Sequence, residues 1–193
     1  MNETEPYEDS LFPEVNIKFA TFWNRLGAAF IDGIIILIFT FPVTYFNIVS
    51  WKIPFLFILT SGIAVIYKPY LEYRYGATLG KMAVGIQVLG HQFEKVSLNE
   101  EMRRVSFYLI PAILTQIMTM GFYFSANFNL ISNYREYNRF IVSSNPAITW
   151  LNGIVFVLLF ADCITFFLND QNRALHDIYA GTYVIEKPKT NSH

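Results

Sequence analysis

The chain has 193 residues, of which 53% are hydrophobic and 15% are charged, and its formal net charge is −1. Its mean hydropathy of +0.34 is high for a soluble domain of this length, so the composition argues against a soluble globular protein. The only cysteine, Cys163, lies in an apolar stretch, which excludes an intrachain disulfide. We expect no nucleic-acid partner, no metal and no cofactor.

Four apolar blocks account for the high hydropathy. They cover approximately residues 26–46, 52–71, 105–124 and 148–168. At about 1.5 Å per residue, each block is long enough to cross ~30 Å of hydrocarbon. A soluble core would instead show amphipathic periods. The sequence therefore predicts an all-α, multi-pass membrane protein with four transmembrane helices in a lipid bilayer.

The segments between these blocks predict the orientation of the chain. With four spans, both termini lie on one side together with the 72–104 loop, and that side carries eleven of the 14 Lys and Arg residues. The positive-inside rule then places both termini in the cytoplasm, and we expect the protein in the cell membrane. Residues 1–18 are expected to form an acidic cytoplasmic tail, because residues 1–17 contain no base and do not resemble a secretory signal. Residues 187–193 form the second cytoplasmic tail.

The first span carries two charged residues on one helical face. Arg25, Ala29, Asp32 and Gly33 share this face because they are offset by four, seven and eight residues. Ala29 and Gly33 form a small-xxx-small pair, which lets another helix approach closely, so we expect the face to contact protein. Both charged side chains lean toward the N-terminus, which disfavours a direct pair. Arg25 is expected to meet headgroups or another carboxylate, with a charge-tuning or structural role.

The connection after the second span contains short cytoplasmic elements. Gly76 is expected to end the second helix and Thr78 to cap a short interfacial helix, from which Lys81 reaches lipid phosphate. Residues 85–89 and 181–186 are β-like runs that can pair beneath the membrane. Two strands alone are only marginally stable.

A capping box marks the start of the third long helix. Ser97 and Glu100 have the Ser-x-x-Glu spacing of this motif. The helix that follows is expected to carry Arg103 and Arg104 to the lipid surface. The outer loop, residues 125–147, contains no motif with a clear chemical meaning.

Two carboxylates are expected at the same depth in the membrane. Asp32 and Asp162 each lie six residues, roughly 9 Å, from the cytoplasmic end of their block. Pro111 falls in the same layer and leaves the carbonyl of Phe107 without its helical donor. If the first and fourth helices are neighbours, these oxygens surround one point that suits Na⁺ or H⁺. The alternative is that both carboxylates hydrogen-bond to neighbouring helices and serve packing alone.

A second polar cluster lies near the C-terminus. Arg173, His176 and Asp177 stand at i, i+3 and i+4, on one face of a helical turn. Asp177 can hold Arg173 or Lys81 and so tie the C-terminal segment to the membrane. His176 can titrate near neutral pH and act as a pH sensor. A structural clamp is the favoured role of the cluster.

Three sequence fragments match the motifs of one family. FWNRLGAAFID has an Arg-x6-Asp motif, GATLGKMAVGIQV a G-x-T-x-G-K-x3-G segment, and NRALHDIYAGTYVI an R-x-x-H-D-x-x-A-G-T motif. On these fragments the chain resembles the RDD family of membrane proteins, named for an arginine and two aspartates. The resemblance covers approximately residues 19–186 and implies one RDD-like membrane domain. The biochemical role of the family is largely undefined, although some members are proposed to move sodium and protons.

Two classes of function remain open. In the first, the protein is a small cation- or proton-coupled transporter of the Na⁺/H⁺ type, with Asp32 and Asp162 as the ion site. Four spans are few for a solute pathway, so such a transporter is expected to be a homo-oligomer. In the second, it is a non-transporting scaffold, assembly factor or partner subunit whose charged residues serve helix packing. An enzyme is not expected, because the three histidines lack metal-binding spacing and no catalytic motif is present.

Overall fold

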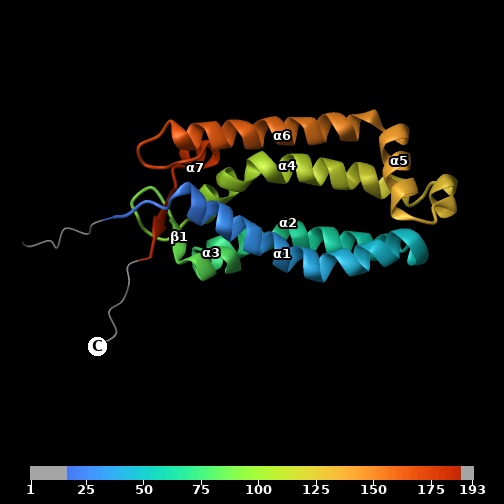
Figure 1. The fold of residues 1–193 in the computed structure, drawn as a ribbon, viewed down its shortest axis with the longest axis horizontal. Helices are drawn as coiled ribbons and strands as arrows, with labels where there is room; N and C mark the ends of the chain where they lie inside the picture. Colours follow the sequence, from blue (N-terminus) through green and yellow to red (C-terminus); the bar gives the residue numbers. More distant parts are fainter. Residues whose placement is uncertain (1–16, 188–193) are drawn as a thin grey trace, which may run out of the picture.

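Four long helices run side by side along the molecule (Figure 1). The computed structural model describes residues 17–187, so most of both predicted tails lies outside the described residues. The helices are α1 (Phe22–Phe46), α2 (Pro54–Tyr75), α4 (Leu98–Phe122) and α6 (Pro146–Phe167). All four are long and apolar enough to cross a membrane, which confirms the predicted fold class.

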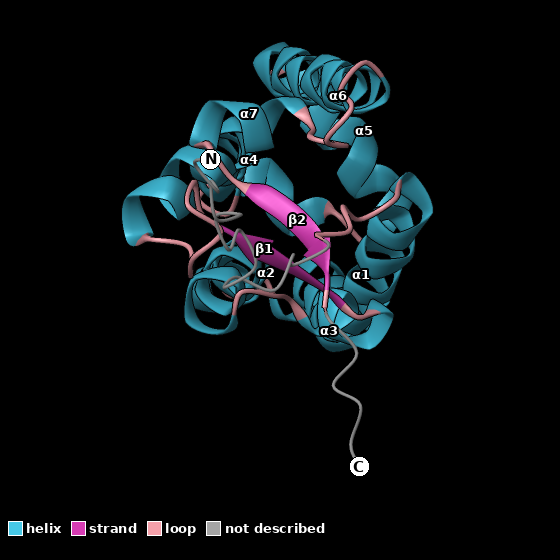
Figure 2. Cartoon of the chain, turned by 90° about the vertical axis from the view of Figure 1, so that its left-hand side faces the viewer, coloured by secondary structure: helices cyan, strands magenta, loops and turns pink. Residues whose placement is uncertain are grey.

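One end of the bundle, called the sheet end below, holds the small elements. These are α3 (Leu79–Val84), β1 (Ile86–Leu89), α7 (Leu175–Ala180) and β2 (Tyr183–Glu186). The two strands pair antiparallel, as Figure 2 shows, which confirms the pairing predicted from the sequence. Hydrogen bonds from Ala20 N to the Val184 carbonyl (2.9 Å) and from Glu186 N to the Lys18 carbonyl (2.8 Å) add a third extended segment. This segment supplies the support that two strands alone lack.

Local sequence signals determine where the helices begin and end. Gly76 ends α2 with φ +70°, a left-handed conformation that favours glycine, and its N–H donates to the Glu72 carbonyl. Thr78 caps α3 through its side-chain oxygen. Ser97 and Glu100 form the predicted capping box at the start of α4.

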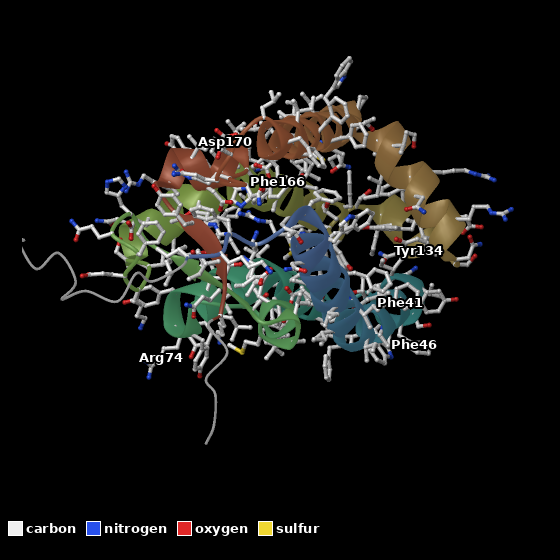
Figure 3. The ribbon with its side chains drawn as sticks, turned by 60° about the vertical axis from the view of Figure 1, so that its left-hand side comes forward. Phe41, Phe46, Arg74, Tyr134, Phe166 and Asp170 are labelled. Carbon is white, nitrogen blue, oxygen red and sulfur yellow. The ribbon has the colours of Figure 1, made fainter. Side chains whose placement is uncertain are left out.

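The opposite end of the bundle is folded more than the sequence analysis predicted. A π-helical turn (Asn47–Trp51) extends α1, and α5 (Tyr134–Ser144) crosses the end of the bundle before α6. Lys52 donates from its ammonium group to the carbonyls of Asn129 (2.6 Å) and Ile131 (2.8 Å) and so holds the outer loop. In Figure 3, Tyr134 and Phe46 lie toward this end, whereas Arg74 and Asp170 lie toward the sheet end.

The shared carboxylate site predicted from the sequence required α1 and α6 to be neighbours, and the packing of the helices differs from this. Helix α1 packs mainly on α3 and α2, whereas α6 packs on α4, α5 and α7. Helices α1 and α6 meet where Phe22 lies against Phe166 and Phe167, with ring centroids 5.9 and 5.1 Å apart. The main neighbours of α1 are therefore α3 and α2 rather than α6.

The predicted small-residue contact was placed on the wrong residues. Ala28, one position before Ala29, is the buried residue of α1, and it meets Gly80 of α3. A Cβ on Gly80 would lie 2.1 Å from the Ala28 carbonyl oxygen, so only glycine fits there. Ala29 and Gly33 are exposed, because α3 approaches the side of α1 next to them.

Candidate functional site

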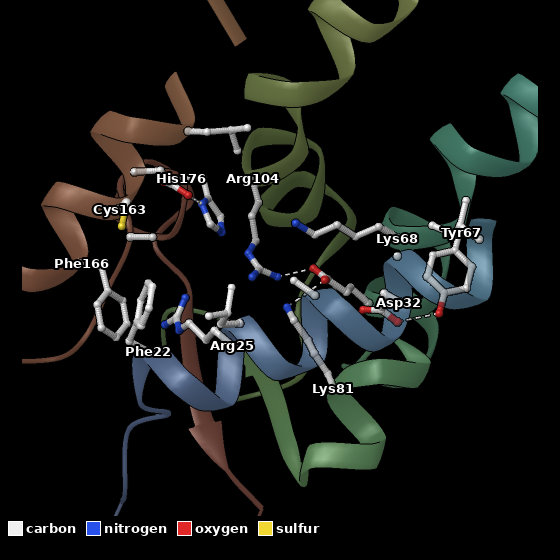
Figure 4. Close-up of a pocket in the computed structure, with 18 residues that line it drawn as sticks. Phe22, Arg25, Asp32, Tyr67, Lys68, Lys81, Arg104, Cys163, Phe166 and His176 are labelled. Atoms are coloured by element: carbon white, nitrogen blue, oxygen red, sulfur yellow. Dashed lines mark hydrogen bonds and ion pairs between the residues drawn. The ribbon is translucent and has the colours of Figure 1, made fainter. Parts of the chain in front are cut away.

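A network of buried charges occupies the sheet end of the bundle (Figure 4). Arg104 lies at its centre and is 1% exposed. Its guanidinium group pairs with the Glu72 carboxylate, and its Nε lies 3.0 Å from Oδ1 of Asp177. Lys81 pairs with the other oxygen of Glu72 at 2.8 Å. The buried Glu72 carboxylate is therefore shared between two cations, which offsets the cost of burying its charge.

Arg25 joins this network from α1. Its guanidinium group pairs with Asp177 and donates to the Asn172 carbonyl at 2.7 Å. The sequence analysis expected Arg25 to meet either lipid headgroups or another carboxylate, and in the structure its partner is the carboxylate of Asp177. The guanidinium carbon lies 5.2 Å from the centre of the Phe166 ring, close enough for a cation–π contact.

The prediction that Lys81 and Arg104 face lipid is wrong. Both side chains are buried because Glu72, which the sequence analysis did not single out, turns inward from α2 and pairs with both. Glu72 is the only acidic residue of α2. A single carboxylate in a mostly apolar helix could have indicated a buried ion pair from the sequence. Arg103, the neighbour of Arg104, is exposed.

Asp32 connects three helices through neutral donors. It accepts hydrogen bonds from the Tyr67 hydroxyl (2.7 Å), the Thr78 hydroxyl (2.5 Å) and the Gly80 backbone N–H (2.7 Å). Three donors on two oxygens stabilise a carboxylate without a paired cation.

Asp162 lies in a separate polar cluster with His176 and Tyr108. It accepts hydrogen bonds from the Tyr108 hydroxyl (2.8 Å) and from the backbone N–H of His176 (3.0 Å). The Nδ1 atom of His176 lies 2.7 Å from Asp162, and its Nε2 atom lies 3.2 Å from Asp177. A carboxylate therefore faces each ring nitrogen, an arrangement in which an imidazolium can donate from both sides.

The predicted partners of Asp177 are wrong. Arg173 precedes α7 and donates to the main-chain carbonyls of Thr182 (3.1 Å) and Asp177 (3.2 Å) rather than to the carboxylate. Lys81 pairs with Glu72. The side chain of Asp177 turns instead toward Arg25 and Arg104, which reach it from α1 and α4.

The network shifts the pKa values of two groups outside the long helices. Burial alone would raise the pKa of the Asp177 carboxyl, but His176, Arg25 and Arg104 outweigh it and hold that pKa well below its usual range. The pKa of Lys81 is lowered to about 8, because burial and the nearby charge of Arg104 together outweigh the opposing effect of Glu72.

Asp32 and Asp162 line one cavity of about 520 Å³ between the helices. They do not form the predicted shared site, because each carboxylate is hydrogen-bonded by its own donors from different elements. Within residues 17–187, Phe107 and Pro111 do not line this cavity. In the same part of the chain, no group of three or more His, Cys, Asp or Glu side chains could hold a metal ion.

Several residues of the site were missed by sequence reasoning. The hydroxyl groups of Tyr67 and Tyr108 donate to Asp32 and Asp162 respectively. The sequence alone does not distinguish a tyrosine that donates a hydrogen bond from one that only packs against its neighbours. Glu101 is buried beside Arg104 at 3.9 Å, and neither carboxylate oxygen has a donor among the described residues. Lys68 lines the cavity, and a lysine inside an apolar helix was a usable signal.

The comparisons with known proteins point to one family. The sequence model of the RDD family matches residues 19–181, which include every member of the charge network from Arg25 to Asp177. No curated protein matches the chain, and no solved structure does. The match covers most of the chain and agrees with the three sequence motifs. The protein therefore belongs to the RDD family and is an integral membrane protein.

Proposed function

We propose that this protein is a proton-coupled membrane transporter that exchanges protons at the Asp162–His176 pair. The observation that supports this most is the position of His176, which lines the cavity and lies between the carboxylates of Asp162 and Asp177. A proton leaving this cluster changes the charge of the cavity wall. Intramembrane ionisable groups in transporters commonly serve such relays.

Asp32 supplies the second carboxylate of the proposed transport cavity. Its oxygens already accept three hydrogen bonds, so a Na⁺ ion would bind there only by displacing the Tyr67, Thr78 or Gly80 donor. The proposed proton exchange is therefore assigned to Asp162 and His176. Na⁺ remains the cation to test for exchange against H⁺, because hard oxygen ligands suit it.

The proposed setting is the cell membrane, where the protein has no enzymatic role and works as a homo-oligomer. A homo-oligomer is proposed because four spans are few for a solute pathway. Subunits packed side by side would supply the additional helices that such a pathway needs.

Proton flux in reconstituted liposomes tests the proposal. Purified protein is reconstituted with a pH-sensitive dye inside, and gradients of Na⁺, K⁺ or choline are imposed at constant ionic strength. We expect the wild type to move protons in response to Na⁺ or K⁺. Asp162→Asn and His176→Gln should each slow this flux by about a hundredfold, the lower end of the contribution typical of a positioned proton-transfer group. Asp170→Asn, in an exposed turn of the same region, is the matched control and should leave the flux unchanged.

The alternative function is a non-transporting scaffold or partner subunit. The shared ion pairs favour it, because Glu72 and Asp177 hold α1, α2, α3, α4 and α7 together as a purely structural network would. Wild-type flux equal to that of empty liposomes, together with a lower melting temperature of Asp162→Asn, would support this alternative and overturn transport.

A further inference from the structure

We propose that the cavity binds the phosphate headgroup of an anionic lipid, which enters sideways from the bilayer between α1 and α6. The inference concerns binding at rest, and it stands or falls independently of transport. It rests on the side opening of the cavity and on two cationic atoms without an acceptor.

The cavity opens on the face of the bundle where α1 and α6 diverge. Leu26 of α1 and Leu159 of α6 both line it, yet they are 47% and 49% exposed. Both helices are long and apolar enough to span the membrane, so this opening faces lipid. The volume of about 520 Å³ falls within the range of roughly 300–1,000 Å³ found for small-ligand pockets.

The cavity wall combines apolar and cationic side chains. Ile36 and Phe166 belong to the apolar lining, and Lys68, Arg25 and Arg104 supply the cations, with Arg25 lying against the Phe166 ring. An acyl chain fits the apolar part of this lining and a headgroup fits the cationic part. This combination matches a lipid better than a free ion from the water phase.

Among the lysine and arginine residues that line the cavity, Lys68 is the one without an ion pair in the described part of the chain. Its side chain extends from α2 into the cavity (Figure 4), and its ammonium nitrogen lies 4.9 Å from the centre of the Tyr108 ring. Among the ion pairs of residues 17–187, none involves Lys68. Among the nearby carboxylates, Glu72 pairs with Lys81 and Arg104, and Asp162 pairs with His176. The carboxylate of Glu101 lies beside Arg104 at 3.9 Å. An unpaired ammonium in a membrane-spanning helix is costly, and a bound phosphate would offset that cost.

Arg25 provides a second unused donor. Its Nε atom is buried and has no acceptor among the described residues, although its other nitrogens bind Asp177 and Asn172. Lys68 lies seven residues, about 10 Å, from the end of α2 at the sheet end. Basic pockets between transmembrane helices on the cytoplasmic side are known to bind anionic headgroups.

Lipid binding to the purified full-length protein tests the inference. Delipidated protein in detergent is titrated with short-chain phosphatidylglycerol, with phosphatidylcholine of the same chain length and with inorganic phosphate. Melting temperature and native mass spectrometry report binding. We expect phosphatidylglycerol to bind with a defined stoichiometry and to raise the melting temperature, while the other two have little effect.

Two variants connect this binding to the cavity. Lys68→Gln should weaken phosphatidylglycerol binding by at least about tenfold, whereas Arg74→Gln, a change to an exposed cation on the same helix, should not. Ala29→Leu narrows the opening at an exposed position and should also weaken binding, which decides the question if Lys68→Gln does not fold.

Three results would overturn the inference. Equal effects of phosphatidylglycerol and phosphatidylcholine would remove the role of the negative charge. An equal effect of inorganic phosphate would show that the source is a free anion rather than a lipid. Unchanged phosphatidylglycerol binding by both Lys68→Gln and Ala29→Leu would place the lipid outside the cavity.

Discussion

Arg104 is the residue on which the charge network depends most. It pairs with two buried carboxylates, Glu72 and Asp177, and these also pair with Lys81 and Arg25 respectively. Removing one partner of a buried ion pair leaves the other charge unpaired in a medium that solvates it poorly. Such a change typically costs about 3–5 kcal/mol, far more than the pair contributes relative to an apolar replacement.

We expect Arg104→Gln to lower the melting temperature strongly, with a loss of stability of about 3–5 kcal/mol. The measurement is thermal unfolding of the purified protein in detergent. Arg103→Gln is the matched control, because Arg103 is adjacent in sequence but exposed, and its loss should change stability by less than about 1 kcal/mol. Equal melting temperatures of the two variants would contradict the central position of Arg104.

The sequence allowed individual charged residues to be selected but not their partners. Asp32, Asp162 and Arg25 stand out because charges are rare in apolar stretches. Asp177 meets Arg25 across 152 positions, and no spacing rule extends that far. Glu72 was overlooked because the predicted second span ended at residue 71, so this carboxylate was placed in a polar loop. The helix continues to Tyr75 and carries Glu72 inward.

Among the elements, α3 determines how α1 is held. This short helix lies against α1 through Gly80, whose N–H binds Asp32 and whose Cα faces the Ala28 carbonyl. The start of α3 was predictable from Thr78 and Gly76, because caps depend on neighbouring residues only. Its docking onto α1 was not predictable, since it depends on which face of α1 is left open by α2 and α6.

Gly80→Ala should displace α3 from α1. The new Cβ would lie 2.1 Å from the Ala28 carbonyl oxygen and 2.8 Å from the Asp32 carboxyl carbon, so the backbone must move. We expect a destabilisation of at least about 1–3 kcal/mol, the usual cost of overpacking. Limited digestion with trypsin should then cut after Lys81, which is buried in the wild type.

Gly62→Ala is the control for this change. Gly62 lies in α2, and a methyl group added there would meet no atom within 4 Å, so its substitution should leave both the melting temperature and the digestion pattern intact. Resistance of Gly80→Ala to cleavage after Lys81, with an unchanged melting temperature, would show that the contact between α3 and α1 is not required.

In the molecule as a whole, the sheet end gathers segments from the beginning, middle and end of the chain. The extended segment Lys18–Ala20, strand β1 and strand β2 lie together there, and α3 and α7 flank them (Figure 2). The four spans were predictable from length and hydropathy alone. The folded outer end was not, because α5 and the π-helical turn follow from contacts such as those of Lys52 with the loop.

The positive-inside rule predicts that the sheet end is cytoplasmic. In a Cys163→Ser background, Ser144→Cys places a thiol at the exposed end of α5, and Asp170→Cys places one at the sheet end. A membrane-impermeant maleimide should label Ser144→Cys in intact cells and Asp170→Cys only after permeabilisation. The reverse pattern of labelling would place the sheet end outside the cell.

The position of Asp177 has a consequence for how the protein is made. Its partners Arg25 and Arg104 precede it by 152 and 73 residues, so the ribosome completes both arginine-bearing helices well before it reaches this aspartate. Until then, two guanidinium groups at the membrane surface lack one of their counter-charges. A chain that terminates before Asp177 keeps them in that state. An unfinished copy thus differs from a finished one in carrying a guanidinium charge that the last segment of the domain would otherwise neutralise.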